Sequence, residues 1–454
     1  MSAMDLTELK KQISRTPSAR ASGRVVGVDS AIVWIKGLSH LACIGDRLRL
    51  YSGDETITGE VLRIKDDQVA MLPDEGADGI ALGNRVVLLG APVISPADSW
   101  IGRIVDPYGT ALDGFPIQPG PVARPYRSRP PKATMRRGLG PRLRTGLAVF
   151  DTILPIVTGQ RIGLFAGSGV GKSTLLAELT RGMEADVVVL ALVGERGREV
   201  RDYVANVLGP EGMKRSVVVA ATSDRSPTER RRCPLAAMTV AEHFRDQGKH
   251  VLLLVDSITR FAEAHREVVI ASGELPAMRG YPPSISNQIM RLAERAGPGI
   301  DGQGDITGVF SVLVAGSDMD EPVADILRGV LDGHVVLDRQ IAERGRYPAI
   351  DVLKSVSRSL PEAASEFENT LIHTTRNLLG RYEKSETLIR AGLYKEGSDS
   401  TLDQAVRAWP GIDDFIGEHS KQGKGSAFGK LQIILSKAGV QLPMPQRDGR
   451  KRAG

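Results

Sequence analysis

Residues 166–173 read Ala-Gly-Ser-Gly-Val-Gly-Lys-Ser, and Thr174 follows directly. The apolar run Ile162–Phe165 leads into this stretch, and Leu175–Thr180 begins a helical pattern. Alternating glycines let successive backbone N–H groups point into one concavity, and the N-terminus of a following helix also attracts phosphate. The stretch is a P-loop with Ala in place of the first glycine. A chance glycine-rich turn would lack the strand, the Lys-Ser pair and the helix, which together predict a parallel α/β sheet.

A nucleotide site follows from the P-loop and from a second strand. We expect Lys172 to reach the β- and γ-phosphates and Ser173 to ligate Mg²⁺. The stretch His250–Asp256 is an apolar strand that ends in a carboxylate, and Asp256 would hold Mg²⁺ through water at the edge where such sheets bind ligands. The alternative, an Asp that caps a turn before Ser257, is weak beside an upstream P-loop. The predicted nucleotide-binding residues are Ala166, Gly167, Ser168, Gly169, Val170, Gly171, Lys172, Ser173 and Thr174.

A Glu-Arg pair ends another predicted strand, Val187–Val193. Glu195 would lie beside Asp256 at the same sheet edge, where it could orient water against the γ-phosphorus. Arg196 could place that carboxylate or touch phosphate. A lone Glu-Arg pair is more often a surface salt bridge, so the residues alone leave both interpretations open.

The chain reads as a multidomain α/β protein. Short runs bounded by Gly, Asp and Ser predict a small β-barrel over residues 23–92. Val-, Ile- and Leu-rich runs without alternation predict a parallel sheet covered on both faces within residues 93–360. Residues 361–440 look helical, with Leu371, Ile372, Leu378, Leu379, Tyr382, Leu388 and Ile389 on apolar faces. Residues 1–22 contain an amphipathic segment at 5–14, either a frayed terminus or a partner-binding helix, and 441–454 form a basic tail.

Composition sets limits on location and partners. The formal charge of +5 permits an acidic partner, a membrane surface or nucleic acid, but fits an ordinary surface equally well. The two cysteines form no disulfide framework, and we expect free thiols in a reducing cytosol, with Cys43 in the core. No apolar stretch reaches membrane-spanning length, so any membrane contact is expected to be peripheral.

A proline-rich segment over residues 116–145 carries eight cations and no acid between them. A nucleic-acid patch is one interpretation, but Tyr126 stands alone where stacking aromatics would be needed. We therefore favour a solvated linker that wraps along the nucleotide-binding domain.

Several stretches together resemble the catalytic subunits of rotary ATP synthases and their type III secretion relatives, with which the similarity covers roughly residues 20–440. Residues 348–357 read Pro-Ala-Ile-Asp-Val-Leu-Lys-Ser-Val-Ser and fit the superfamily signature. The resemblance implies a central RecA-like P-loop domain between a β-barrel and a helical domain, with Mg²⁺ as cofactor. The matching stretches are Gly167–Thr174, Gly194–Val200, Val251–Phe261, Gly273–Ser286 and Asp332–Ser357.

The resemblance also implies roles for individual residues. Glu195 looks like the catalytic carboxylate, with Lys172 and Arg196 beside it, and Tyr347 looks like the residue that stacks on adenine. Arg260 resembles an arginine close to the γ-phosphate, and Arg358 resembles the arginine finger that reaches the neighbouring subunit's nucleotide. Since one chain carries both Glu195 and Arg358, the resemblance implies a homo-oligomeric ring, by analogy a hexamer.

The C-terminal region lacks the acidic lever of rotary catalytic subunits, and its residues 394–406 resemble the secretion branch. Residues 163–172 and 335–344 resemble the flagellar members of that branch in particular. That resemblance implies a cytoplasmic ATPase at the inner membrane that unloads export chaperones and cargo proteins at an export gate. It also implies a stator-like regulator bound to the N-terminal segment. Virulence-type secretion is the nearest alternative. A rotary synthase subunit ranks lower, because the absent acidic lever argues against a catalytic subunit and Glu195 argues against a non-hydrolysing one. An RNA-translocating hexamer ranks lower, because Trp34 and Tyr51 are the only aromatics in the predicted barrel, which makes nucleic acid an unlikely partner.

Overall fold

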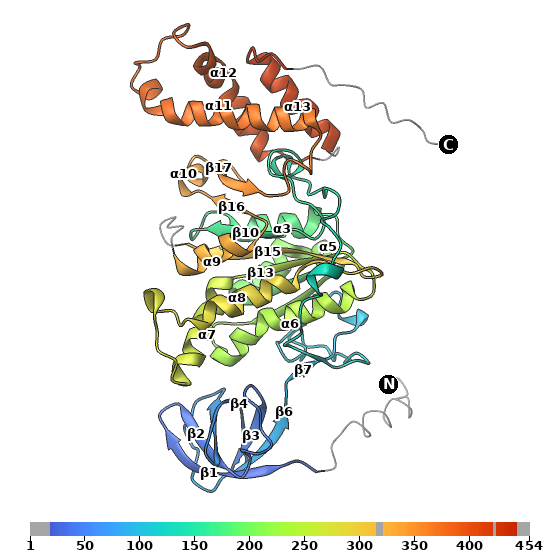
Figure 1. Cartoon of the computed structure of the whole chain (residues 1–454), viewed down its shortest axis with the longest axis vertical. Coiled ribbons are helices and arrows are strands. Elements are labelled where there is room, and N and C mark those ends of the chain that lie inside the picture. The colour runs from blue at the N-terminus through green and yellow to red at the C-terminus, as the bar shows by residue number, and fades with distance from the viewer. Residues whose placement is uncertain (1–18, 315–320, 421–423, 443–454) are drawn as a thin grey trace, which may run out of the picture.

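The computed structural model describes residues 19–314, 321–420 and 424–442. Figure 1 shows three tiers along the long axis: a β-barrel, a layered α/β domain and a group of helices. This arrangement confirms the predicted fold class. The amphipathic segment expected at residues 5–14 and the basic end at 447–454 lie outside the described residues.

Six antiparallel strands close the barrel. Alternate side chains face its core, so Val33 and Ile35 of one strand are both fully buried. Cys43 is exposed, and the expectation that it is a core residue was wrong. Leu38 and Ala42 occupy the inward positions of that loop, which leaves Cys43 on its outer side. The strand order is β1 (Ser22–Asp29), β2 (Ile32–Lys36), β5 (Gln68–Pro73), β4 (Glu55–Lys65), β3 (Arg47–Ser52) and β6 (Arg85–Gly90).

The central sheet is mostly parallel, as the apolar runs predicted. Two pairings are antiparallel, β16 with β17 and the short β14 (Gly297–Pro298) with β15. Every strand expected from the sequence in this domain is present. The order is β17 (Ile350–Ser357), β16 (Gly333–Leu337), β10 (Arg161–Ala166), β15 (Asp305–Leu313), β13 (Val251–Asp256), β11 (Val187–Val193), β12 (Ser216–Ala221) and β8 (Ile104–Val105).

Both faces of this sheet are buried. In β11, Val188 and Leu190 pack into the core on one face, while Val189 and Ala191 pack into the core on the other. That double burial explains why β11 is apolar at every position. One face is covered by α3 (Lys172–Gly182) and the π-helix η3 (Tyr203–Leu208); the other is covered by α6 (Pro227–Arg245), α7 (Ile258–Ala271), α8 (Ser284–Arg295) and α9 (Pro322–Val330).

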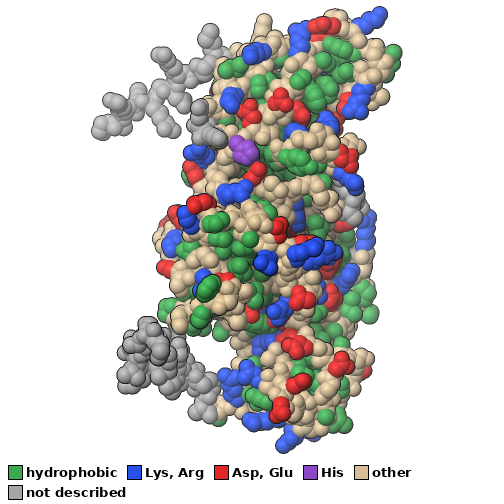
Figure 2. All heavy atoms as spheres, turned by 180° about the vertical axis from the view of Figure 1, so that it is seen from behind, with side chains coloured by type: hydrophobic (Ala, Val, Ile, Leu, Met, Phe, Trp, Pro, Cys, Tyr) green, Lys and Arg blue, Asp and Glu red, His purple; other side chains and the backbone are tan. Residues whose placement is uncertain are grey.

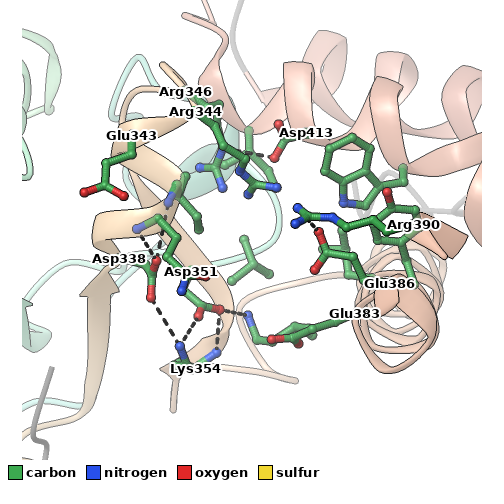
Figure 3. Close-up of a pocket in the computed structure, with 18 residues that line it drawn as sticks. Asp338, Glu343, Arg344, Arg346, Asp351, Lys354, Glu383, Glu386, Arg390 and Asp413 are labelled. Atoms are coloured by element: carbon green, nitrogen blue, oxygen red, sulfur yellow. Dashed lines mark hydrogen bonds and ion pairs between the residues drawn. The ribbon is translucent and has the colours of Figure 1, made fainter. Parts of the chain in front are cut away.

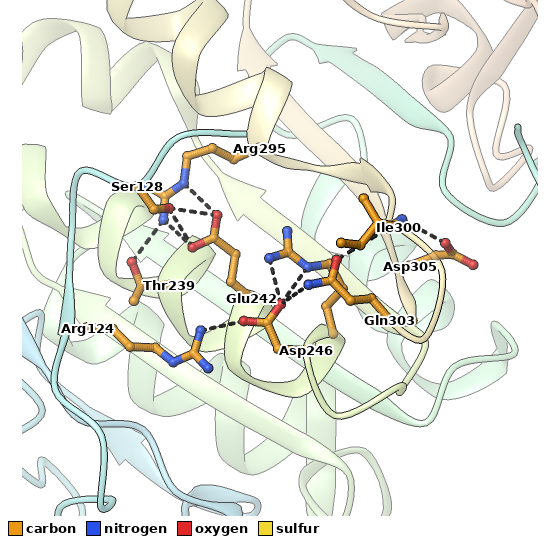
Figure 4. A network of polar contacts seen from close by, with 12 residues as sticks. Arg124, Ser128, Thr239, Glu242, Asp246, Arg295, Ile300, Gln303 and Asp305 are labelled. Carbon is orange, nitrogen blue, oxygen red and sulfur yellow. Dashed lines mark hydrogen bonds and ion pairs between the residues drawn. The ribbon is translucent and has the colours of Figure 1, made fainter. Parts of the chain in front are cut away.

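The basic segment 116–145 runs along this domain, but its cations are not simply solvated. Arg124 pairs with Asp246 of the α/β domain at 2.7 Å, and Arg137 pairs with Asp305 at 2.7 Å. Ser128 donates a hydrogen bond to Glu242, whose carboxylate also holds the buried Arg295 (Figure 4). We correct the solvated picture accordingly, since these arginines fasten the segment to the domain.

The C-terminal tier consists of α11 (Glu366–Arg390), α12 (Ser400–Gly417) and α13 (Lys424–Lys437). Leu371, Ile372, Leu378 and Leu379 are buried as predicted. Leu388 is 51% exposed, so its expected place on an apolar face was wrong, because its side chain points outward where the next residue, Ile389, is partly buried. The buried residues of these helices join the same core as the short helix α2 (Ala148–Asp151).

The outer surface carries both signs of charge. Figure 2 shows Lys and Arg side chains interspersed with Asp and Glu over all three tiers of one face. None of the helices described here combines the length and the apolar character that a membrane crossing requires.

Candidate active site

The P-loop joins β10 to α3, as predicted. Gly169 and Gly171 have φ angles of +77° and +88°, which side chains with a Cβ rarely adopt, so glycine is required at both turns. Lys172 and Ser173 then begin α3, and the free N–H groups of that helix end face the loop. The loop therefore has the shape of an anion cradle.

Asp256 ends β13 and is 4% exposed. Lys172 forms an ion pair with it, and the hydroxyl of Ser311 on β15 donates to its Oδ1 at 2.7 Å. These two donors hold the carboxylate in place inside the protein. We did not predict Ser311 from the sequence. Its signal was present, since a fully buried polar residue inside an apolar strand needs a partner.

Glu195 follows β11 at the same edge of the sheet, as predicted. Gly194 has a φ of +68° and turns the chain so that Glu195 lies near Asp256. Partial burial raises the pKa of Glu195 to about 7, and the negative charge of Asp256 acts in the same direction, whereas Lys172 opposes it. Glu199 raises the pKa further through a shared hydrogen bond. This carboxyl group is thus tuned to exchange a proton near neutral pH.

The two arginines expected to act near Glu195 lie differently. Arg260 packs its aliphatic stem against Gly194, where an added Cβ would meet its side chain at 3.3 Å, and its guanidinium pairs with Glu263 at 2.9 Å. Arg196 has a side chain that is 75% exposed and lies 3.5 Å from Glu199.

Tyr347 lies against the P-loop. A Cβ added to Gly171 would approach two ring carbons of Tyr347 at 3.2 Å, so the ring covers the turn that precedes Lys172. The ring is half exposed, which leaves one side available to a ligand.

Arg358 lies away from all of these residues. Its backbone N–H bonds to the carbonyl of Asp332, whose carboxylate also binds Arg161 at the beginning of β10. Arg358 is therefore level with the amino end of β10, about 17 Å along the strand from the P-loop, farther than an arginine side chain extends. Its guanidinium bonds to the carbonyl of Leu331 at 2.9 Å, beyond the end of α9.

A cavity of about 470 Å³ opens at the carboxyl edge of the sheet and is lined by Ser173, Glu195, Glu199, Tyr203 and Asp256, among others. A hydroxyl and a carboxylate lie at one wall, and oxygen atoms of this kind are the ligands that Mg²⁺ takes when it binds together with phosphates. The donor set therefore fits a magnesium–nucleotide complex.

The strand-to-helix P-loop and the aspartate that ends a neighbouring parallel strand define a P-loop nucleotide-binding protein of the RecA-like class. Comparisons with known proteins refine this class. Residues 146–357 match the model of the ATP synthase alpha/beta family, nucleotide-binding domain. Residues 365–426 match the T3SS EscN ATPase C-terminal domain.

Relatives with known names match over most of the chain. This chain is 41% identical to a flagellum-specific ATP synthase of Agrobacterium fabrum, and the match covers 96% of this chain and 92% of the relative. It is 38% identical to a type 3 secretion system ATPase of Xanthomonas euvesicatoria, with 92% and 94% covered. The assembled ATPase EscN of enteropathogenic E. coli, solved in complex with its central stalk EscO, superimposes with a TM-score of 0.82 at 36% identity, covering 91% of this chain and 100% of that one. The chain belongs to the family of flagellum-specific ATP synthases and type III secretion ATPases.

Proposed function

We propose that this chain hydrolyses Mg²⁺-bound ATP in a ring of identical subunits, by analogy a hexamer, and thereby energises protein export through a flagellar type III apparatus. The observation that carries the ring is the position of Arg358. The P-loop, Asp256 and Glu195 meet at one edge of the sheet, while Arg358 lies at the other edge and cannot reach them. An arginine so placed serves a nucleotide held by a neighbouring copy.

The residues at the carboxyl edge divide the work. Lys172 contacts the β- and γ-phosphates, and the loop from Ala166 to Thr174 wraps them with backbone N–H groups. Ser173 would hold Mg²⁺ directly and Asp256 would hold it through water, and the ion would neutralise charge on the phosphate oxygens. Glu195 orients the attacking water and accepts its proton, because an ionised carboxylate with a pKa near 7 is a competent base at neutral pH.

Three further residues complete the proposal. Tyr347 stacks its exposed side on the adenine. Arg260 acts close to the γ-phosphate, and Arg196 steadies the Glu195 region through Glu199. Arg358 stabilises the negative charge that spreads over the γ-phosphoryl oxygens of the neighbour's nucleotide in the transition state.

Mixed rings test the shared site. We expect Glu195→Gln and Arg358→Ala to abolish hydrolysis separately while both variants still bind ATP. When the two are mixed, an Arg358→Ala subunit beside a Glu195→Gln subunit has a complete site, so activity should return in part. Mixtures that remain inactive, or a fully active isolated monomer, would contradict the shared site.

The pH dependence tests Glu195. Since its pKa is raised to about 7, kcat/KM for ATP should be high above pH 7 and fall as Glu195 takes up a proton below it. Glu199→Gln removes one cause of the raised pKa, so the acid limb of the profile should move to lower pH. If the acid limb of the pH–activity profile does not move in this variant, the limb reports the titration of a group other than Glu195.

Flagellar export is the branch we propose, because the sequence motifs around residues 163–172 and 335–344 resemble flagellar members. Virulence-type secretion is the second candidate, supported by the C-terminal match to the secretion ATPases. Restored swimming when the gene is placed in a flagellated strain that lacks its own export ATPase would support the first. Restored effector secretion alone would favour the second.

Partners follow from the same proposal. By analogy with a relative solved on its central stalk, we expect a stalk-like protein and a stator-like regulator, the latter bound to the N-terminal segment. Export chaperones with their cargo, and a gate at the inner membrane, complete the set, with the ATPase in the cytoplasm and peripheral to that membrane. Co-purification from intact cells tests each of these partners.

A further inference from the structure

The segment Arg344–Pro348 approaches both Gly171 of the P-loop and Gly417 of α12 through Tyr347. Figure 3 shows Arg344 and Arg346 beside Asp413 of the helical tier. Arg346 folds back over the segment and donates to the carbonyls of Pro348 at 2.7 Å and Ile350 at 2.9 Å. Its Nε donates to Oδ1 of Asp413 on α12 at 3.1 Å. The Arg346 side chain is 11% exposed, so this ion pair is largely shielded from water.

The next residue faces the opposite direction. Tyr347 covers Gly171 of the P-loop, while its carbonyl oxygen lies close to Gly417 at the end of α12, where an added Cβ would meet it at 3.1 Å. Arg346 and Tyr347 therefore connect α12 to the P-loop through two consecutive residues.

The space beside this connection is hollow. A cavity of about 530 Å³ separates β17 and α10 (Arg339–Glu343) from α11 and α12. Arg346 and Asp413 line it, and the Arg344 guanidinium lies 5.5 Å from the Trp409 ring across it. Because packing is missing on this side, the position of the segment depends on these few directed contacts.

We propose that Arg346 and Asp413 are positioning residues that hold Tyr347 over the base of the nucleotide, so that α12 sets the affinity of the P-loop for ATP. This inference rests on the proposed role of Tyr347 in base stacking. An arginine fork bound to both a carboxylate and two carbonyls fixes a segment before the ligand arrives, which reduces the ordering cost of binding.

The first measurement separates affinity from chemistry. Asp413→Asn removes the charge but leaves both carbonyl bonds of Arg346, so the chain still folds while the segment becomes freer. We expect the KM for ATP to rise roughly three- to tenfold, as for the net contribution of one ordinary hydrogen bond, with kcat changed less than twofold. Asp413→Glu should recover most of the affinity. Asp414→Asn, at the exposed neighbour on α12, is the matched control and should leave KM unchanged.

A double-mutant cycle then tests whether the effect passes through Tyr347. In the Tyr347→Ala background, Asp413→Asn should add almost nothing to the KM. If it adds the same factor in both backgrounds, or leaves the KM unchanged in the natural chain, the positioning role is overturned. If Tyr347→Ala alone leaves the KM unchanged, the stacking assignment fails instead, which distinguishes the two failures.

Discussion

The α/β domain meets its two neighbours in different ways. Its contact with the barrel, here called the barrel joint, combines buried ion pairs with a small apolar cluster in which Leu62 and Leu72 pack against Val268 of α7. Glu60 of β4 is 3% exposed and accepts hydrogen bonds from Arg231 and Arg232 of α6, the latter at 2.7 Å. Asp74, after β5, accepts from Thr228 at 2.5 Å, near the beginning of α6.

Its contact with the C-terminal helices, here called the helical joint, is apolar on one side and hollow on the other. Phe415 of α12 and Phe150 of α2 belong to one continuous core. The cavity that Arg346 and Asp413 line lies on the other side. The barrel core, in contrast, is separate from the cores of the α/β domain.

The difference assigns a mechanical role to each joint. Buried ion pairs are directional and costly to break singly, so the barrel joint fixes the barrel to α6. Apolar contact is non-directional, and the cavity leaves one side of the helical joint without packing, so we expect the helical tier to be displaced more easily than the barrel. Movement driven by ATP is therefore expected at the helical joint.

The largest effect is expected from Glu60→Gln. This change leaves Arg231 and Arg232 in the barrel joint without a full counter-charge, and breaking a buried pair costs about 3–5 kcal/mol. Calorimetry should show a large fall in the temperature of the transition that includes the barrel. A fall equal to that of a surface control such as Glu55→Gln, on the exposed part of β4, would contradict the fixed joint.

A smaller effect is expected from Asp74→Asn, about 1–3 kcal/mol, because Asp74 neutralises one arginine, Arg47, whereas Glu60 neutralises two, and the Asn oxygen still accepts a hydrogen bond. Burial alone would raise the pKa of Asp74, but hydrogen bonds from Arg47, Thr228 and Thr58 outweigh it and leave the pKa lowered.

The pH dependence of this variant follows from the sign of that shift. The stabilising contribution is complete above the unfolded pKa of about 3.9 and is lost as pH falls through the lower folded pKa. Lowering the pH should therefore reduce the free energy of unfolding of the natural protein more than that of the Asp74→Asn variant. Equal acid sensitivity in the two proteins would exclude Asp74 as the cause.

Phe415→Leu tests the apolar side of the helical joint. Since the substitution keeps much of the volume and replaces one apolar surface by another, we expect a cost of about 1 kcal/mol. Chemical denaturation followed by far-UV circular dichroism gives the value. A cost as large as that of Glu60→Gln would mean that the helical joint is as rigidly specified as the barrel joint.

The smallest effect on stability is expected from Asp413→Asn, below about 1 kcal/mol, because Arg346 keeps both of its carbonyl bonds and the pair borders a cavity rather than a packed core. Hydrogen exchange should show faster exchange in α12 and unchanged exchange in β4 and α6. Slower or unchanged amide exchange in α12 would contradict the contrast between the two joints.

The sequence predicted best what depends on neighbours along the chain. Local patterns predicted the P-loop, its flanking strand and helix, and the strand that ends at Asp256. The continuous apolar runs predicted the parallel sheet, because both faces of that sheet are buried. Cys43 and Leu388 were misjudged because an apolar run does not show which of its members faces the core.

Contacts between distant residues could not be predicted in this way. Arg232 and Glu60 are 172 positions apart, and Arg346 and Asp413 are 67 apart, so only the assembled tiers bring each pair together. The arginines of segment 116–145 were taken for a solvated series for the same reason, since their partners Asp246 and Asp305 come from later strands and helices.

The position of Arg358 has an arithmetic consequence. If each copy contributes its guanidinium to the nucleotide site of one neighbour only, an open chain of copies always has one nucleotide site, at its end, that no neighbour completes. ATP turnover per copy should therefore rise with the number of copies in the open chain. It should reach its maximum only when the last copy contacts the first and the ring closes.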